Sequence, residues 1–142
     1  MFSDILLAVD LTAPETQTKA VAAAVGQAQA FGSRLHVVTV VPEVHSGIVA
    51  GVFPKDFEGK ALEAARQQLH AYCEKTIPAE LKVQHIVAHG TIYQEIVRAA
   101  EQTGCQLIVM ASHRPELSDF LLGPNAARVV RHAACSVMII RE

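Results

Sequence analysis

A cluster of hydrogen-bonding side chains follows the apolar run at residues 107–111 and could bind phosphate. The cluster contains Ser112, His113 and Arg114. An arginine guanidinium grips phosphate through two parallel hydrogen bonds, and serine and histidine add further donors. Residues 123–125 (Gly-Pro-Asn) then lead into a predicted helix. The first N–H groups and the positive dipole end of a helix stabilise an anion, so these residues predict a nucleotide-phosphate site.

Asp10 could complete such a site, because it directly follows the apolar run at residues 5–9. A carboxylate there could hold a divalent metal or a sugar hydroxyl against the same phosphates. The alternative for Asp10 is a turn-forming role before Pro14. Likewise, residues 112–114 could be a solvated loop, and Gly123 a packing residue beneath the helix start. A lone glycine-containing loop is a weak motif, so both interpretations stay open on the residues alone.

Short apolar runs alternate with amphipathic segments along the chain, and these elements must position the candidate residues. Such alternation predicts a parallel sheet with right-handed crossovers and helices on both faces. Ligands of such sheets bind at the carboxyl ends of strands where the winding reverses. The predicted strands are residues 5–9, 35–41, 83–88, 107–111 and 137–140. The first predicted helix begins at Pro14, with Thr12 as its cap, and ends at Gly32. The other predicted helices are residues 62–72, the segment from residue 92 to Gly104, and residues 126–133.

Composition narrows the class of protein. The 142 residues predict a single domain over 1–142, and 51% hydrophobic against 18% charged residues excludes a disordered chain. A net charge of −2 provides no basic field, so we expect no nucleic-acid and no membrane partner. Three scattered cysteines and no long apolar run or leader-like start favour a cytoplasmic protein.

Several stretches resemble the universal stress protein family, in the order in which the family carries them. Asp4–Asp10 resembles its opening strand, and residues 89–97 resemble its turn from the third strand into a helix. Residues 107–115, 121–123 and 135–140 resemble its C-terminal signature. The Ser-His-Arg-Pro and Leu-Leu-Gly motifs within that signature are most similar to the F/G-type branch.

The resemblance implies an α/β three-layer sandwich: a five-stranded parallel sheet of order 3-2-1-4-5 with helices on both faces, an adenine nucleotide alpha hydrolase-like fold. The switch point would lie between strands one and four, the two strands that precede Asp10 and Ser112. A homodimer is also implied, because the last strand would otherwise leave an apolar edge uncovered. Its interface would be formed by Val137, Met138, Ile139 and Ile140.

The family's ATP binders carry a loop of three spaced glycines followed by serine or threonine. Here Ala111 and Arg114 occupy the first two glycine positions, Gly123 is retained, and Pro124 replaces the hydroxyl residue. One residue is also missing between the second and third positions. The Ala111 methyl group crowds a close backbone approach, Arg114 disfavours positive φ, and Pro124 removes an N–H donor.

The resemblance still implies that ATP, with Mg, is the ligand. Asp10 matches the position near the ribose, phosphates and metal, Val40 lies near the adenine edge, and Ala8 and Val9 belong to the pocket floor. The predicted nucleotide-binding residues are Ala8, Val9, Asp10, Val40, Met110, Ala111, Ser112, His113, Arg114, Gly123, Pro124 and Asn125.

Three functions compete for this chain. The first is a regulatory protein that binds an adenine nucleotide and acts on an unknown protein partner. The second is a nucleotide-independent homodimeric module with a vestigial site, which Ala111 and Pro124 favour. The third is an enzyme. Two observations argue against it: the cysteines look like packing residues, and His85 and His89 are the single pair of histidines with a spacing that metal ligands use. We therefore expect no catalytic residue and no direct metal ligand beyond Asp10 through phosphate-bound Mg, while slow ATP hydrolysis stays open.

Overall fold

The computed structural model describes residues 1–42, 57–112 and 124–142. Within them, five strands alternate with four α-helices and one short 3-10 turn, as the apolar runs predict. The strands are β1 (Asp4–Ala8), β2 (Arg34–Pro42), β3 (Val83–Gly90), β4 (Leu107–Ser112) and β5 (Ser136–Arg141). The helical elements are η1 (Pro14–Gln17), α1 (Thr18–Phe31), α3 (Phe57–Thr76), α4 (Ile92–Thr103) and α5 (Pro124–His132).

All five strands form one parallel sheet of order β3-β2-β1-β4-β5, so the expected fold is confirmed. The chain winds outward from β1 through β2 to β3, and then returns to place β4 on the other side of β1. The carboxyl ends of β1 and β4 therefore flank the point where the winding reverses, which is where ligands bind in sheets of this kind.

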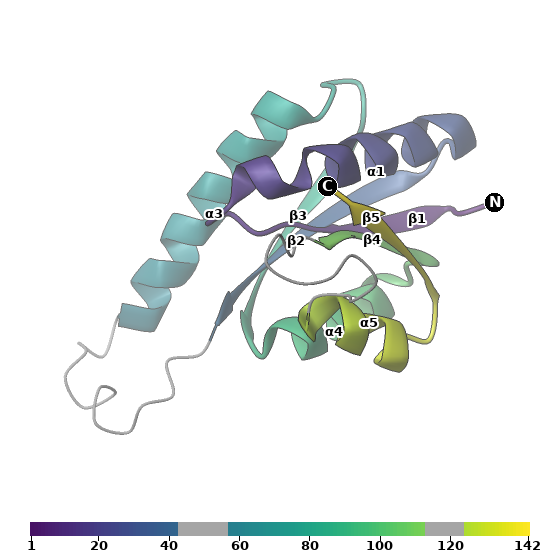
Figure 1. Cartoon of the computed structure of the whole chain (residues 1–142). Helices are drawn as coiled ribbons and strands as arrows, with labels where there is room; N and C mark the ends of the chain where they lie inside the picture. Colours follow the sequence, from purple (N-terminus) through teal and green to yellow (C-terminus); the bar gives the residue numbers. More distant parts are fainter. Residues whose placement is uncertain (43–56, 113–123) are drawn as a thin grey trace.

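Two helical layers cover the sheet, with α1 and α3 on one face and α4 and α5 on the other (Figure 1). Side chains alternate between the faces because successive residues of a strand point to opposite sides. On β1, Ile5 and Leu7 belong to the core beneath α1, whereas Leu6 and Ala8 belong to the core beneath α4 and α5. Each central strand is apolar on both faces, as expected of a buried parallel sheet.

Glycine ends two of the helices where the sequence predicts. Gly32 follows α1 with φ of 63° and Gly104 follows α4 with φ of 69°, and this left-handed conformation suits a residue without a Cβ atom. The predicted start of the first helix is wrong, because Pro14 opens η1 and α1 begins only at Thr18. Thr12 is not a helix cap. Its hydroxyl instead donates to Asp10 Oδ1.

No helix in the described part of the chain is long and apolar enough to cross a membrane.

Candidate functional site

A cavity of about 440 Å3 opens at the carboxyl edge of the sheet. Its walls come from the ends of β1, β2 and β4, from the segment around η1, and from the first turns of α4 and α5. The described lining residues are Ala8, Val9, Asp10, Thr12, Ala13, Thr16, Gln17, Val38, Val40, Pro42, Ile92, Ile96, Met110, Ala111, Ser112, Pro124, Asn125 and Ala126. A volume of several hundred Å3 suits a small organic ligand.

The floor of this cavity is apolar because one row of strand residues faces α4 and α5. Ala8, Val40 and Met110 all belong to the core cluster on that face, and Ile92 and Ile96 of α4 lie in the same cluster. Such a surface can hold a flat, weakly polar ring without leaving polar groups unpaired.

Asp10 is exposed at the rim, two residues beyond the end of β1. Its Oδ1 atom accepts hydrogen bonds from the Thr12 N–H at 2.9 Å and from the Thr12 hydroxyl at 2.6 Å. This local turn orients the carboxylate. Among the described residues, none is recorded as hydrogen-bonded to Oδ2. Asp10 can therefore bind a cation or accept from a ligand hydroxyl through that atom.

The first turn of α5 forms another part of the cavity wall. Pro124 is the first residue of the helix, and its missing N–H removes no helical hydrogen bond because the first N–H groups of a helix have no acceptor within it. Asn125 and Ala126 follow at the cavity wall, and Ser112 at the end of β4 is buried beside them. The positive end of the α5 dipole thus lies at the carboxyl edge, in the wall of the cavity that Asp10 also lines.

Every predicted nucleotide-binding residue that the structure describes lies at this one cavity. The tips of β1 and β4 meet there, as the topology requires. His113, Arg114 and Gly123 are outside the described residues.

The sequence interpretation missed the segment that follows Asp10. Thr12, Thr16 and Gln17 line the cavity, and Gln17 binds the Asp10 backbone. The signal was their polar character directly after the first strand, which the interpretation assigned to a helix start. Ile92 and Ile96 were also missed, although the helix they begin must start at the carboxyl edge of β3.

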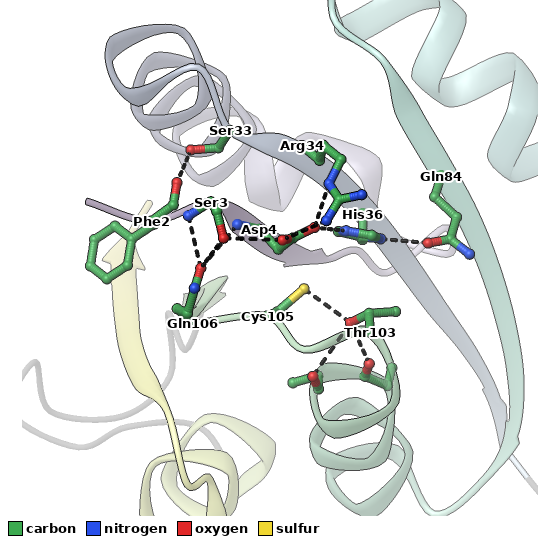
Figure 2. Close-up of polar contacts among 12 residues, drawn as sticks. Phe2, Ser3, Asp4, Ser33, Arg34, His36, Gln84, Thr103, Cys105 and Gln106 are labelled. Carbon is green, nitrogen blue, oxygen red and sulfur yellow. Dashed lines mark hydrogen bonds and ion pairs between the residues drawn. The ribbon is translucent and has the colours of Figure 1, made fainter.

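The opposite, amino edge of the sheet carries a different polar cluster (Figure 2). Asp4 Oδ1 lies 2.8 Å from His36 Nε2, and Arg34 donates to both carboxylate oxygens at 3.0 Å. The Asp4 N–H donates to Gln106 Oε1 at 3.0 Å. Burial raises the pKa of Asp4, but hydrogen bonds from His36, Arg34 and Ser3 outweigh it and hold the pKa below its usual value. The carboxylate is thus paired on every side within the protein.

The cysteines offer no reactive thiolate at neutral pH. Burial raises the pKa of Cys73 to about 11, and it raises the pKa of Cys105 and Cys135 as well. Cys105 and Cys135 line a second, smaller cavity of about 250 Å3 between the ends of α4 and α5. Glu101 contributes the one charged side chain among its described lining residues. The larger cavity, with its apolar floor and polar rim, is the better candidate for a ligand site.

The fold is that of a doubly wound α/β protein, and the cavity lies at its topological switch point, where proteins of this class bind ligands. A sequence model described as the universal stress protein family matches residues 1–141. Universal stress protein G of Escherichia coli O157:H7 is 30% identical over 144 residues, which cover 99% of this chain and 100% of the relative. The chain therefore belongs to the universal stress protein family, and its relatives support the G-type branch.

Solved structures share this fold over nearly the whole chain. The structure of MJ0577, a universal stress protein of Methanocaldococcus jannaschii, superposes with a TM-score of 0.77 at 24% identity, covering 100% of this chain and 97% of that one. A universal stress protein in complex with cAMP gives 0.67 at 19% identity, covering 98% and 97%. The Archaeoglobus fulgidus protein in complex with dAMP gives 0.63 at 19% identity, covering 96% of each chain.

Proposed function

We propose that this protein binds an adenine nucleotide, ATP with Mg²⁺, in the cavity between the tips of β1 and β4. One observation carries the proposal: an apolar floor and an exposed carboxylate, Asp10, line the same cavity at the switch point. The family relatives solved with cAMP and with dAMP support the adenine nucleotide class. The role we propose is binding and regulation rather than catalysis, with a protein partner still unknown.

The base occupies the apolar end of the cavity in this proposal. Val40 and Met110 would contact the two faces of a flat ring, and Ala8 leaves room beneath it because its side chain is a single methyl group. Backbone groups at the end of β2 would pair with the polar edge of the adenine. Burying both faces of a ring against such side chains favours binding through the hydrophobic effect.

The polyphosphate end explains why a metal ion belongs to the proposal. Asp10 is the one charged side chain among the described lining residues, and its negative charge repels a bare phosphate. A Mg²⁺ ion held by the Asp10 carboxylate and the phosphates removes that repulsion, and Mg²⁺ is commonly bound through one carboxylate plus substrate phosphates. The first turn of α5 would face the phosphates with N–H groups from Asn125 onward.

Two departures from the family's glycine loop, Ala111 and Pro124, obstruct the proposed nucleotide site less than the sequence suggests. The Ala111 side chain packs against the core cluster on the α1 face, whereas the proposed base lies on the α4 face with Met110. The added methyl group is therefore directed away from the base. Pro124 begins α5, so it removes an N–H only at the first position and leaves those of Asn125 and Ala126 in place.

Isothermal titration decides the proposal. We expect ATP with Mg²⁺ to bind, ATP with a chelator to bind more weakly, and adenosine to bind without dependence on Mg²⁺. No heat and no thermal shift at millimolar nucleotide would end the proposal. The alternative, a nucleotide-independent dimeric module, would then be favoured. Ala111 and Pro124 would in that case indicate a vestigial site that has lost nucleotide binding.

A homodimer through β5 is proposed alongside either function. β5 is an outer strand whose described neighbour is β4 alone, and Val137 to Ile140 are half-buried on both faces. An edge of this kind favours pairing with a second copy. We expect Ile139→Lys to yield a monomer by light scattering, because a charge would enter the paired strand. A dimer that persists in this variant would place the interface elsewhere.

A further inference from the structure

Gln17 is a buried polar side chain that hydrogen-bonds to the backbone of Asp10 in the candidate site. It is 3% exposed, and its two polar atoms bind the backbone of one residue. The Asp10 N–H donates to Gln17 Oε1 at 2.7 Å, and Gln17 Nε2 donates to the Asp10 carbonyl at 2.8 Å. The strand ladder stops just before this point, where the Val9 N–H donates to the Val38 carbonyl at 2.9 Å. Gln17 thus continues the hydrogen bonding of the chain where the sheet no longer does.

The start of α1, which follows Gln17 directly, is held by a residue from the far end of the chain. Gln17 makes no side-chain cap to this helix. Instead, Glu142 Oε1 accepts the N–H groups of Lys19 at 2.8 Å and Ala20 at 3.1 Å. Figure 1 shows the C-terminus beside the first turns of α1. A carboxylate at a helix N-terminus accepts hydrogen bonds from the unpaired N–H groups and complements the dipole. Glu142 therefore fixes the start of α1, the helix that directly follows Gln17.

Tyr72 of α3 contacts the same cluster from a third element. Burial raises the pKa of Tyr72, a hydrogen bond with Gln17 lowers it, and the nearby Cys73 and Glu142 raise it again. The net pKa is above the ordinary value, so the hydroxyl keeps its proton at neutral pH. Gln17 is therefore buried between Asp10, Tyr72 and the Glu142-capped helix.

We propose that Gln17, held in place by Glu142, is a positioning residue that aims the Asp10 carboxylate at metal-bound phosphates. The inference rests on the proposed function, because Asp10 is its target. Gln17 acts by fixing the Asp10 backbone, and the Thr12 hydrogen bonds then set the carboxylate relative to that backbone. Through Glu142, which follows β5, the phosphate end of the cavity is also tied to the outer strand of the sheet.

The test compares Gln17→Met, Glu142→Ala and Glu142→Gln. Methionine keeps the bulk of Gln17 but removes its donor and acceptor, and glutamine at 142 keeps the acceptor atom. Thr103→Ala is the control, since it removes a part-buried hydrogen bond, from the Thr103 hydroxyl to the Ala99 carbonyl at the end of α4, that involves no member of the Gln17 cluster. We expect Gln17→Met to speed amide hydrogen exchange at Asp10 by about tenfold and to weaken ATP·Mg²⁺ binding about fivefold, as loss of a buried hydrogen bond implies.

Adenosine affinity should change less than about twofold in Gln17→Met, because the apolar floor is untouched. Glu142→Ala should shift exchange and ATP affinity in the same direction by less, and Glu142→Gln should restore both. If Gln17→Met matches Thr103→Ala in Asp10 exchange and in ATP affinity, the inference is overturned. If the unaltered protein binds no nucleotide, the proposed function fails, and the exchange rates still show whether Gln17 and Glu142 hold Asp10.

Discussion

The two ends of β1 each carry an aspartate, and the surroundings of the two differ. Asp4 at the amino end is 5% exposed, and its carboxylate is paired with His36 and Arg34. Asp10 beyond the carboxyl end is exposed, and the described hydrogen bonds to its carboxylate come from Thr12, a neighbour in the chain. The amino edge uses its charge to hold strands together, whereas the carboxyl edge keeps a charge available for a ligand.

The difference follows from the connections of a parallel sheet. At the amino edge, helices end and short turns lead straight into the next strand, so side chains such as His36 and Gln84 meet across neighbouring strands (Figure 2). At the carboxyl edge, the crossovers from β1 and β4 leave in opposite directions and open a space between them. A polar group is therefore satisfied internally at one end and left for solvent or ligand at the other.

The largest effect is expected from removing the carboxylate of the amino edge. Asp4→Ala should lower the free energy of unfolding by about 3 kcal/mol, because the buried His36 side chain would lose the carboxylate that it is paired with. Urea denaturation measures this loss. Glu63→Ala, which breaks the exposed pair with Arg66, serves as the control and should cost under about 0.5 kcal/mol. ATP affinity should be unchanged in Asp4→Ala, and a parallel loss of binding would show that the two ends are coupled.

A second substitution fills the apolar end of the cavity. Val40→Trp should weaken ATP and adenosine binding alike, each by about 30-fold, because the indole would occupy the space assigned to the base. Titration calorimetry with both ligands makes the comparison, and circular dichroism checks that the fold is kept. If only ATP binding falls, the base lies elsewhere in the cavity.

Asp10→Ala should affect only the polyphosphate end. We expect ATP·Mg²⁺ binding to weaken about tenfold, with adenosine within about twofold, since a single exposed carboxylate contributes through the metal. The free energy of unfolding should change by less than about 0.5 kcal/mol, as is usual for an exposed site. Equal losses for the two ligands would assign Asp10 to the shape of the rim rather than to the metal.

The smallest effect concerns pH. Although burial raises the pKa of Asp4, hydrogen bonds from His36 and Arg34 hold this pKa below its ordinary value, so the ionised form is favoured in the folded protein. The stability this provides is fully present above the unfolded pKa and is lost as the pH falls through the lower folded value. Urea denaturation between pH 6 and about pH 3 should show a decline that is shallower in Asp4→Asn. Identical slopes would remove Asp4 as a source of acid sensitivity.

The strands, most helix ends and the two strand tips that flank the cavity could all be predicted from the sequence. Apolar runs such as residues 5–9 identify buried strands, and Gly32 and Gly104 mark helix ends through their conformation. The start of the first helix could not be predicted, because Pro14 is as suitable for a 3-10 turn as for an α-helix. What selects the turn is Gln17 folding back onto Asp10, a contact that no local pattern signals.

By itself, the sequence determined the alternation of strands and helices, the apolar faces and the placement of Asp10 after the first strand, since these depend on short-range periodicity. Tertiary structure decided which side chains meet. Register across β1, β2 and β3 places Asp4 beside Arg34 and His36 beside Gln84, so that His36 contacts both Asp4 and Gln84. The return of the chain to β4 opens the cavity at Asp10. The Glu142 cap on α1 joins residues 122 positions apart in the chain. Such contacts arise only when the packed sheet brings remote segments together, because nothing in the local backbone specifies them.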